Sequence, residues 1–142
     1  MPNPPVPRSR NVRLLDVLPV VPYTALVFYT GLIRLGDLPE VGFVPTDKLL
    51  HALVFGGLAL ILLRAEGALL PHWPIAKRFA GALLGSSILG ALLEVCQSFT
   101  TYRSADVLDW VADTVGSLLA LAAAAVVLRV SARLGREEAS GS

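Results

Sequence analysis

The feature that most constrains this chain is a set of four long, mainly apolar segments. They cover about 14–35, 47–65, 79–99 and 106–128. Each is about 20 residues long, which is enough for a helix to cross a bilayer. Only 16% of the residues are charged, whereas soluble domains carry about 25%. The sequence therefore predicts an all-α membrane protein, built as a bundle of four transmembrane helices.

The two ends of the chain differ from this central region. Residues 1–13 are rich in proline and arginine, which is typical of a disordered tail. A cleaved signal peptide is not expected there, because the apolar run that follows is too long and has no small-residue cleavage site after it. Residues 129–142 are charged, and we expect a flexible tail.

The basic residues predict which side of the membrane each end occupies. Nine of the 12 lysines and arginines lie in the two tails and in the connection between the second and third spans. Only Arg34, Lys48 and Arg103 lie on the other side. Because cytoplasmic segments carry an excess of basic residues, we expect both termini in the cytoplasm.

With this topology, polar residues from three spans meet at the outer side of the membrane. Acids at membrane depth are costly unless they are paired or face a wet cavity. Asp106 is expected to cap the last helix, and Arg103 to serve as a counter-ion and a candidate anion-binding residue. We predict an acidic pocket that opens to the outer side and is gated by arginine. The polar cluster and candidate ligand site is formed by Asp47, Lys48, His51, Glu94, Gln97, Arg103, Asp106, Asp109 and Asp113.

These residues do not specify a known reaction. The chain has no Ser-His-Asp order, no glycine-rich phosphate loop and no setting that would activate Cys96. Its two histidines exclude a zinc site built on several His and Cys ligands within one chain. Glu94, Asp109, Asp113 and His51 offer oxygen and imidazole ligands, but their spacing matches no metal motif. We therefore expect no cofactor and no metal site.

Small residues recur every fourth position in the last span, next to its acids. They are Ala112, Gly116, Ala120 and Ala124. Such a stripe lets membrane helices approach closely, so it is interpreted as a helix-packing surface.

The polar motifs, taken in order, resemble the VanZ-like family. They are Asp47-Lys-Leu-Leu-His51, Glu94-Val-Cys-Gln97 and Arg103-Ser-Ala-Asp106-Val-Leu-Asp109 with Gly116. The resemblance implies a small multi-pass protein of the bacterial cytoplasmic membrane. The founding member is associated with low-level teicoplanin resistance, and no catalytic mechanism is established for the family. The family usually has Asn where this chain has Asp113, and the extra acid requires a further proton, cation or arginine contact.

Three functional hypotheses follow, of which we prefer the first. It is a non-enzymatic envelope protein whose outer cluster binds a cell-wall lipid precursor, a lipid head group or a glycopeptide. The second is a membrane-embedded, metal- or carboxylate-dependent hydrolase or transferase that acts on an envelope lipid, with Glu94 or Asp109 as general base. The third is a structural partner of another membrane protein. No nucleic-acid partner is expected, and the sequence does not define the oligomeric state.

Overall fold

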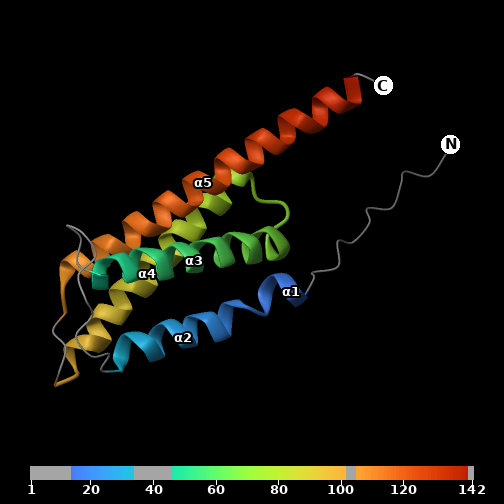
Figure 1. Ribbon diagram of the computed structural model, residues 1–142. Helices are drawn as coiled ribbons and strands as arrows, with labels where there is room; N and C mark the ends of the chain where they lie inside the picture. Colours follow the sequence, from blue (N-terminus) through green and yellow to red (C-terminus); the bar gives the residue numbers. More distant parts are fainter. Residues whose placement is uncertain (1–13, 34–45, 102–104, 141–142) are drawn as a thin grey trace.

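The computed structural model describes residues 14–33, 46–101 and 105–140, and these residues contain helices and no strand (Figure 1). The helices are α1 (Leu14–Val17), α2 (Val20–Leu32), α3 (Thr46–Leu69), α4 (Ile75–Ser98) and α5 (Val107–Ser140). Taken together, α1 and α2 form one apolar span, and α3, α4 and α5 form three more that are long enough to cross a membrane. The prediction of an all-α bundle with four membrane-spanning segments is confirmed.

The first span was expected to be one continuous segment over 14–35, but it is broken into two helices. It is interrupted at Leu18 and Pro19, which form a turn between α1 and α2. Pro19 and Pro22 lack the backbone N–H groups that a continuous helix would direct at earlier carbonyls, and each ring would clash with the carbonyl four residues before it. The chain resumes the helix after Pro19, whose carbonyl accepts a hydrogen bond from the Tyr23 N–H.

The connection between the second and third spans is shorter than expected. α3 continues beyond the expected end at 65 to Leu69, and the Leu70 N–H still donates to the Glu66 carbonyl. Pro71 then prevents further helix. α4 begins at Ile75 instead of 79, because the Pro74 carbonyl accepts the N–H groups of both Lys77 and Arg78.

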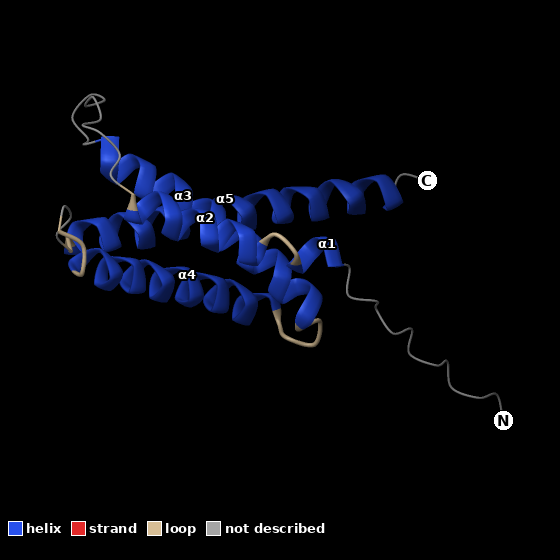
Figure 2. Cartoon of the chain, turned by 90° about the horizontal axis from the view of Figure 1, so that it is seen from below, coloured by secondary structure: helices blue, strands red, loops and turns tan. Residues whose placement is uncertain are grey.

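The last helix also extends further than the expected end at 128. α5 runs to Ser140, so that most of the segment expected to be a flexible tail is helical. Its Ala, Leu, Arg and Glu residues favour helix, and no proline interrupts them. Every residue from 126 to 139 is exposed, because α5 projects beyond the other helices (Figure 2). Residues 1–13, the other expected tail, lie outside the described part of the chain.

α3 and α5 form the most extensive helix pair, and glycine makes their close approach possible. A Cβ atom on Gly116 would overlap the backbone of Ala52, and one on Gly56 would lie 3.1 Å from the Gly116 carbonyl oxygen. Deeper in the same interface, Ser117 donates to the Phe55 carbonyl at 3.1 Å. The predicted small-residue stripe therefore does pack against a neighbouring helix, through Gly116 and Ala120.

The buried core is small and the outer surface is apolar. The core includes Phe55, Leu58 and Leu93, which are at most 1% exposed. Large apolar side chains cover the outside of all four spans, for example Leu26, Leu53, Leu84 and Leu119. In water such a surface would be an aggregation hazard, whereas in a bilayer it faces lipid tails.

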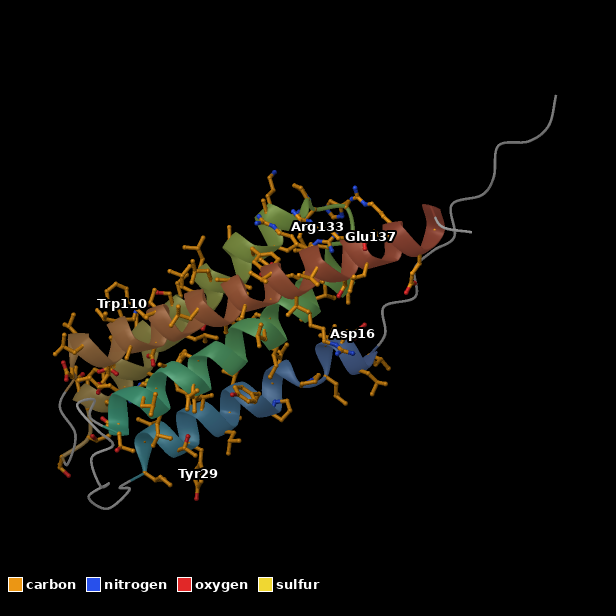
Figure 3. All side chains as sticks on the ribbon, turned by 45° about the horizontal axis from the view of Figure 1, so that its top comes forward. Asp16, Tyr29, Trp110, Arg133 and Glu137 are labelled. Atoms are coloured by element: carbon orange, nitrogen blue, oxygen red, sulfur yellow. The ribbon has the colours of Figure 1, made fainter. Side chains whose placement is uncertain are left out.

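The bundle has two chemically different ends. We call the end at which α3 and α5 begin, and at which α2 and α4 finish, the cluster end (Figure 1). The labelled rings of Tyr29 and Trp110 lie toward this end, and the charged Arg133 and Glu137 toward the other (Figure 3). At that opposite end, Arg64 of α3 pairs with Asp16 at 2.7 Å. The start of α1 and the end of α5 lie at the same end, as an even number of spans requires.

Candidate functional site

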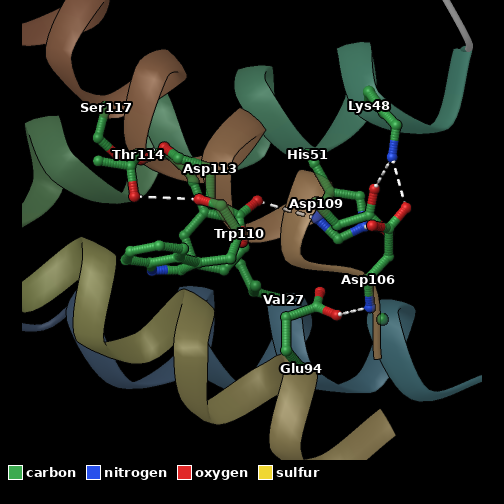
Figure 4. A network of polar contacts seen from close by, with 12 residues as sticks. Val27, Lys48, His51, Glu94, Asp106, Asp109, Trp110, Asp113, Thr114 and Ser117 are labelled. Atoms are coloured by element: carbon green, nitrogen blue, oxygen red, sulfur yellow. Dashed lines mark hydrogen bonds and ion pairs between the residues drawn. The ribbon is translucent and has the colours of Figure 1, made fainter. Parts of the chain in front are cut away.

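The first layer of the cluster is an ion-paired group at the surface of the cluster end. Lys48, in the first turn of α3, lies 2.8 Å from Asp106 Oδ2 and 2.6 Å from Asp109 Oδ1 (Figure 4). Asp109 is 7% exposed, whereas the side chain of Asp106 is 44% exposed. Lys48 thus links an exposed acid and a buried one, and ties the start of α3 to the start of α5.

Asp106 has a second role, as the predicted helix cap. Its Oδ1 accepts the Leu108 N–H at 2.8 Å, and its backbone carbonyl accepts the Asp109 N–H at 2.9 Å. The hydrogen bond from Lys48 lowers the pKa of Asp106 from its ordinary value, and the hydrogen bond from Leu108 lowers it further. Asp106 is therefore ionised at neutral pH.

The second layer lies deeper and is formed by His51 and Asp113. His51 Nδ1 and Asp113 Oδ1 are 2.9 Å apart, and the residues are 8% and 0% exposed. The other His51 nitrogen, Nε2, lies 3.9 Å from Asp109 Oδ2. Gly90 of α4 makes room for the Asp113 carboxylate, since a Cβ atom there would lie 2.7 Å from Asp113 Oδ2. The extra acid at position 113 thus has a histidine partner.

Glu94 enters the cluster from the end of α4. It is 6% exposed, and its Oε2 accepts the Asp106 N–H at 2.8 Å. Its other oxygen, Oε1, has no hydrogen-bond partner in the described structure, and neither has Asp113 Oδ2. Figure 4 shows the Glu94 carboxylate pointing toward the space beside His51 and Asp113.

The remaining predicted site residues have different positions. Asp47 lies beside His51 and Asp109, near enough for one atom of each to share a ligand. Gln97 is 1% exposed, and its amide donates to the Gly31 carbonyl, so that it holds α4 to α2. Arg103 lies outside the described residues. Within the described part of the chain, it is Lys48 that supplies the cation.

A pocket of about 260 Å³ adjoins the cluster between α2, α3 and α4. Its wall is mostly apolar, and Asp47 and His51 are its ionisable members. The lining residues are Val27, Thr30, Gly31, Asp47, Leu50, His51, Val54, Phe55 and Leu93. His51 therefore contacts Asp113 through Nδ1 and also borders the pocket.

Sequence reasoning expected an acidic pocket and missed the mostly apolar lining of the one observed. It also missed a second set of polar contacts between α3, α4 and α5. The hydroxyls of Ser86 and Ser117 are 2.8 Å apart and both lie close to the Phe55 carbonyl. Ser87 and Thr114 form a similar hydroxyl pair at 2.9 Å, and Trp110 Nε1 donates to the Ser87 carbonyl at 3.1 Å. The serines in the third span were the available signal.

These features define a class: a multi-span α-helical membrane protein with an ion-paired, partly buried carboxylate cluster beside an apolar pocket. The chain matches the VanZ/LLP1 family model over residues 9–128 and belongs to that family. No curated protein and no solved structure matches it significantly.

Proposed function

We propose that this protein is a non-enzymatic component of the bacterial envelope that binds an amphiphilic molecule at the cluster end. Part of a hydrocarbon chain would occupy the pocket, and a polar group would contact Asp47 and His51. The observation that carries the proposal is the position of the pocket. It lies among three membrane-spanning helices, and its wall includes two residues of the charged cluster.

The size of the pocket limits what it holds. Complete small-molecule sites have volumes of about 300–1,000 Å³, and this one has about 260 Å³. It accommodates a segment of one chain rather than a whole lipid. The rest of the ligand would stay in the bilayer or at its surface, which suits a lipid precursor or an acylated glycopeptide.

The charges of the cluster favour particular polar groups. Asp47 and the neighbouring Asp109 are acids, and His51 has polar nitrogens, so hydroxyl and amine groups of a ligand would be attracted there. An outward-facing cluster end, which the distribution of basic residues predicts, would place this site where cell-wall precursors and glycopeptides are found.

The test compares two tryptophan substitutions on α3. Leu50→Trp fills the pocket, whereas Leu53→Trp adds the same ring to the lipid-facing surface three residues away, where Leu53 is 64% exposed. Binding of teicoplanin, which carries a fatty acyl chain, and of vancomycin, which lacks one, is measured by fluorescence titration with the protein in nanodiscs.

We expect the wild type and Leu53→Trp to bind teicoplanin at least tenfold more tightly than vancomycin, and Leu50→Trp to lose this preference. In a sensitive Gram-positive host, the same two proteins should raise tolerance to teicoplanin more than to vancomycin. If Leu50→Trp and Leu53→Trp bind teicoplanin equally well, the pocket is not the site. If neither teicoplanin nor an isoprenoid carrier lipid binds the wild type, the proposed function is wrong.

A second candidate is a hydrolase or transferase that acts on an envelope lipid. The observation that favours it is the His51–Asp113 hydrogen bond of 2.9 Å beside the pocket. A histidine that a carboxylate orients in this way can act as a general base. The test is turnover of a radiolabelled isoprenoid diphosphate lipid. An activity that His51→Gln abolishes would favour this candidate over simple binding.

A further inference from the structure

We propose that His51, Glu94 and Asp113 form a binding site for a divalent transition-metal ion, of which Zn²⁺ and Mn²⁺ are the best-matched examples. One imidazole and two carboxylates come from three different helices, α3, α4 and α5. The proposal goes beyond the amphiphile-binding function and does not depend on it. It also differs from the sequence-based expectation of no metal site.

The geometry of the three side chains suits a single ion. One potential ligand atom from each residue lies within 4.8 Å of the other two, and all three residues are buried. Ligands about 2.0–2.1 Å from a tetrahedral zinc ion lie about 3.4 Å apart. Side-chain rotations that bring these atoms about 1 Å closer together would therefore complete the site.

Two buried oxygens without partners point to a ligand at this position. Glu94 Oε1 and Asp113 Oδ2 are both inaccessible and have no hydrogen-bond partner in the described structure. Buried polar atoms are nearly always paired, and leaving one unpaired carries a substantial penalty. Both atoms belong to the same group of three residues, which favours it over the alternative group of Asp47, His51 and Asp109.

The balance of charge supports a cation as the missing partner. Three acids of the cluster, Glu94, Asp109 and Asp113, are buried. When His51 is neutral, the only cation among the described residues that forms a salt bridge with any of these three is Lys48, which contacts Asp109. Lys48 is already shared between Asp106 and Asp109. Unpaired acids at membrane depth are costly, so a divalent ion between Glu94 and Asp113 would neutralise the excess negative charge.

The ligand types select the class of metal. Mg²⁺ and Ca²⁺ prefer ligand sets made of oxygen alone, whereas an imidazole with carboxylates suits Zn²⁺, Mn²⁺ and related ions. The ion would replace the proton of the hydrogen bond between His51 Nδ1 and Asp113 Oδ1. Binding should therefore release protons and weaken as the pH falls.

The test measures metal binding directly. The full chain is purified in detergent, stripped with a chelator and dialysed against Zn²⁺, Mn²⁺ or Mg²⁺. Bound metal is then counted by mass spectrometry, and Co²⁺ is added as a spectroscopic probe of the ligands. We expect about one Zn²⁺ or Mn²⁺ per chain, with at least tenfold weaker binding of Mg²⁺, and a Co²⁺ absorption spectrum typical of nitrogen and oxygen ligands.

Matched variants locate the ion. Glu94→Gln and Asp113→Asn keep side-chain shape and should each weaken Zn²⁺ binding at least tenfold. Asp16→Asn removes an acid at the opposite end of the bundle and should leave the affinity unchanged. Circular dichroism establishes that each variant is folded. If one of the two cluster variants is unfolded, the other variant and the Co²⁺ spectrum of the wild type decide.

Two results would overturn the proposal. One is a wild-type protein that takes up less than about 0.1 ion per chain, which would mean that protons or another residue, such as Arg103, neutralise the acids. The other is an affinity that is equal in the wild type, Glu94→Gln and Asp113→Asn. Neither result would affect the teicoplanin comparison, because that experiment compares substitutions in the pocket.

Discussion

Replacing Lys48 by methionine should destabilise the protein, because Asp109 would lose its cation. Lys48 Nζ lies 2.6 Å from Asp109 Oδ1, and the Asp109 side chain is only 9% exposed. Methionine retains most of the apolar length of lysine, so the change mainly removes the charge. Among the described residues, Asp109 would then be a buried acid left only with the 3.9 Å contact to His51 Nε2, which is an ion pair only when His51 is protonated.

The expected size of the effect follows from the burial of the two ion pairs. Removing one partner of a buried pair costs roughly 3–5 kcal/mol, whereas an exposed pair contributes under about 1 kcal/mol. The Lys48 side chain is 26% exposed, so we take the lower end of the buried range. Lys48→Met should lower the free energy of unfolding by about 3 kcal/mol, which corresponds to a fall in melting temperature on the order of 10 °C.

The assay is thermal and denaturant unfolding of the detergent-purified protein at pH 7 in the presence of a chelator, so that metal binding does not contribute. Combining Lys48→Met with Asp109→Asn removes both charges and should recover most of the loss. The control is Arg64→Met, which breaks the pair with Asp16, where the arginine side chain is 67% exposed. Its cost should stay under about 1 kcal/mol.

The reasoning would be refuted if Lys48→Met and Arg64→Met were equally stable, since Asp109 would then be solvated in spite of its position. It would also be refuted if the double variant were no more stable than Lys48→Met.

Three further predictions concern packing, topology and pH. Gly116→Ala should lower the free energy of unfolding by about 1–3 kcal/mol or more, because the new methyl group meets the backbone of Ala52. Its control, Gly135→Ala on the same helix, meets nothing within 4 Å and should be neutral or slightly stabilising. Equal melting temperatures of the two variants would contradict this packing. A fluorescent reporter that is active only in the cytoplasm should give a signal when fused to Ser142, and a signal from an exported reporter instead would reverse the topology. Asp106→Asn keeps a capping side chain but loses the ion pair with Lys48, and the lowered pKa of Asp106 fixes the sign of its pH dependence. The stability advantage of the wild type over Asp106→Asn should be complete above the ordinary pKa of 3.8, and it should disappear as the pH falls through the lowered pKa of Asp106. An advantage that persists in stronger acid would exclude the ion pair as its cause.

The helices were predictable because their signals are local. Apolar length gave the four spans, and Asp106 was correctly expected to cap the last one. The small residues of the last span also indicated close packing, which Gly116 provides. The helix ends were less predictable, because Pro74 starts α4 earlier than expected and the residues after Leu128 continue α5 without tertiary support.

The pairing within the cluster was not predictable, because it depends on which faces of α3 and α5 meet. Arg103, Lys48 and His51 were the available cations and donors, and the expectation that Arg103 is a counter-ion concerns a residue outside the described part of the chain. In the structure, α3 and α5 start at the same end and run in parallel. Residues further along α3 therefore contact residues further along α5: Lys48 pairs with Asp109, and His51 pairs with Asp113.

An acidic pocket was expected at this end, but its lining could not be predicted, because it combines two residues of the charged cluster with apolar residues of three helices. Thr30 and Gly31 of α2 carry no motif, and Leu93 of α4 has the character of any core residue. Their proximity to His51 follows from the arrangement of α2 and α4 around α3. That arrangement depends on contacts such as the one between Gln97 and the Gly31 carbonyl.

The most direct test of the central claim, that an amphiphile occupies the pocket, is to map where a photoreactive lipid attaches. The protein in nanodiscs is irradiated with an acyl amine that carries a diazirine in its chain, and the labelled residues are identified by peptide mass spectrometry. The account predicts that label concentrates on Val27, Thr30, Leu50 and Val54, and that Leu50→Trp removes it while Leu53→Trp does not. Label spread evenly over lipid-facing residues such as Leu84 and Leu119, and unchanged by Leu50→Trp, would contradict it.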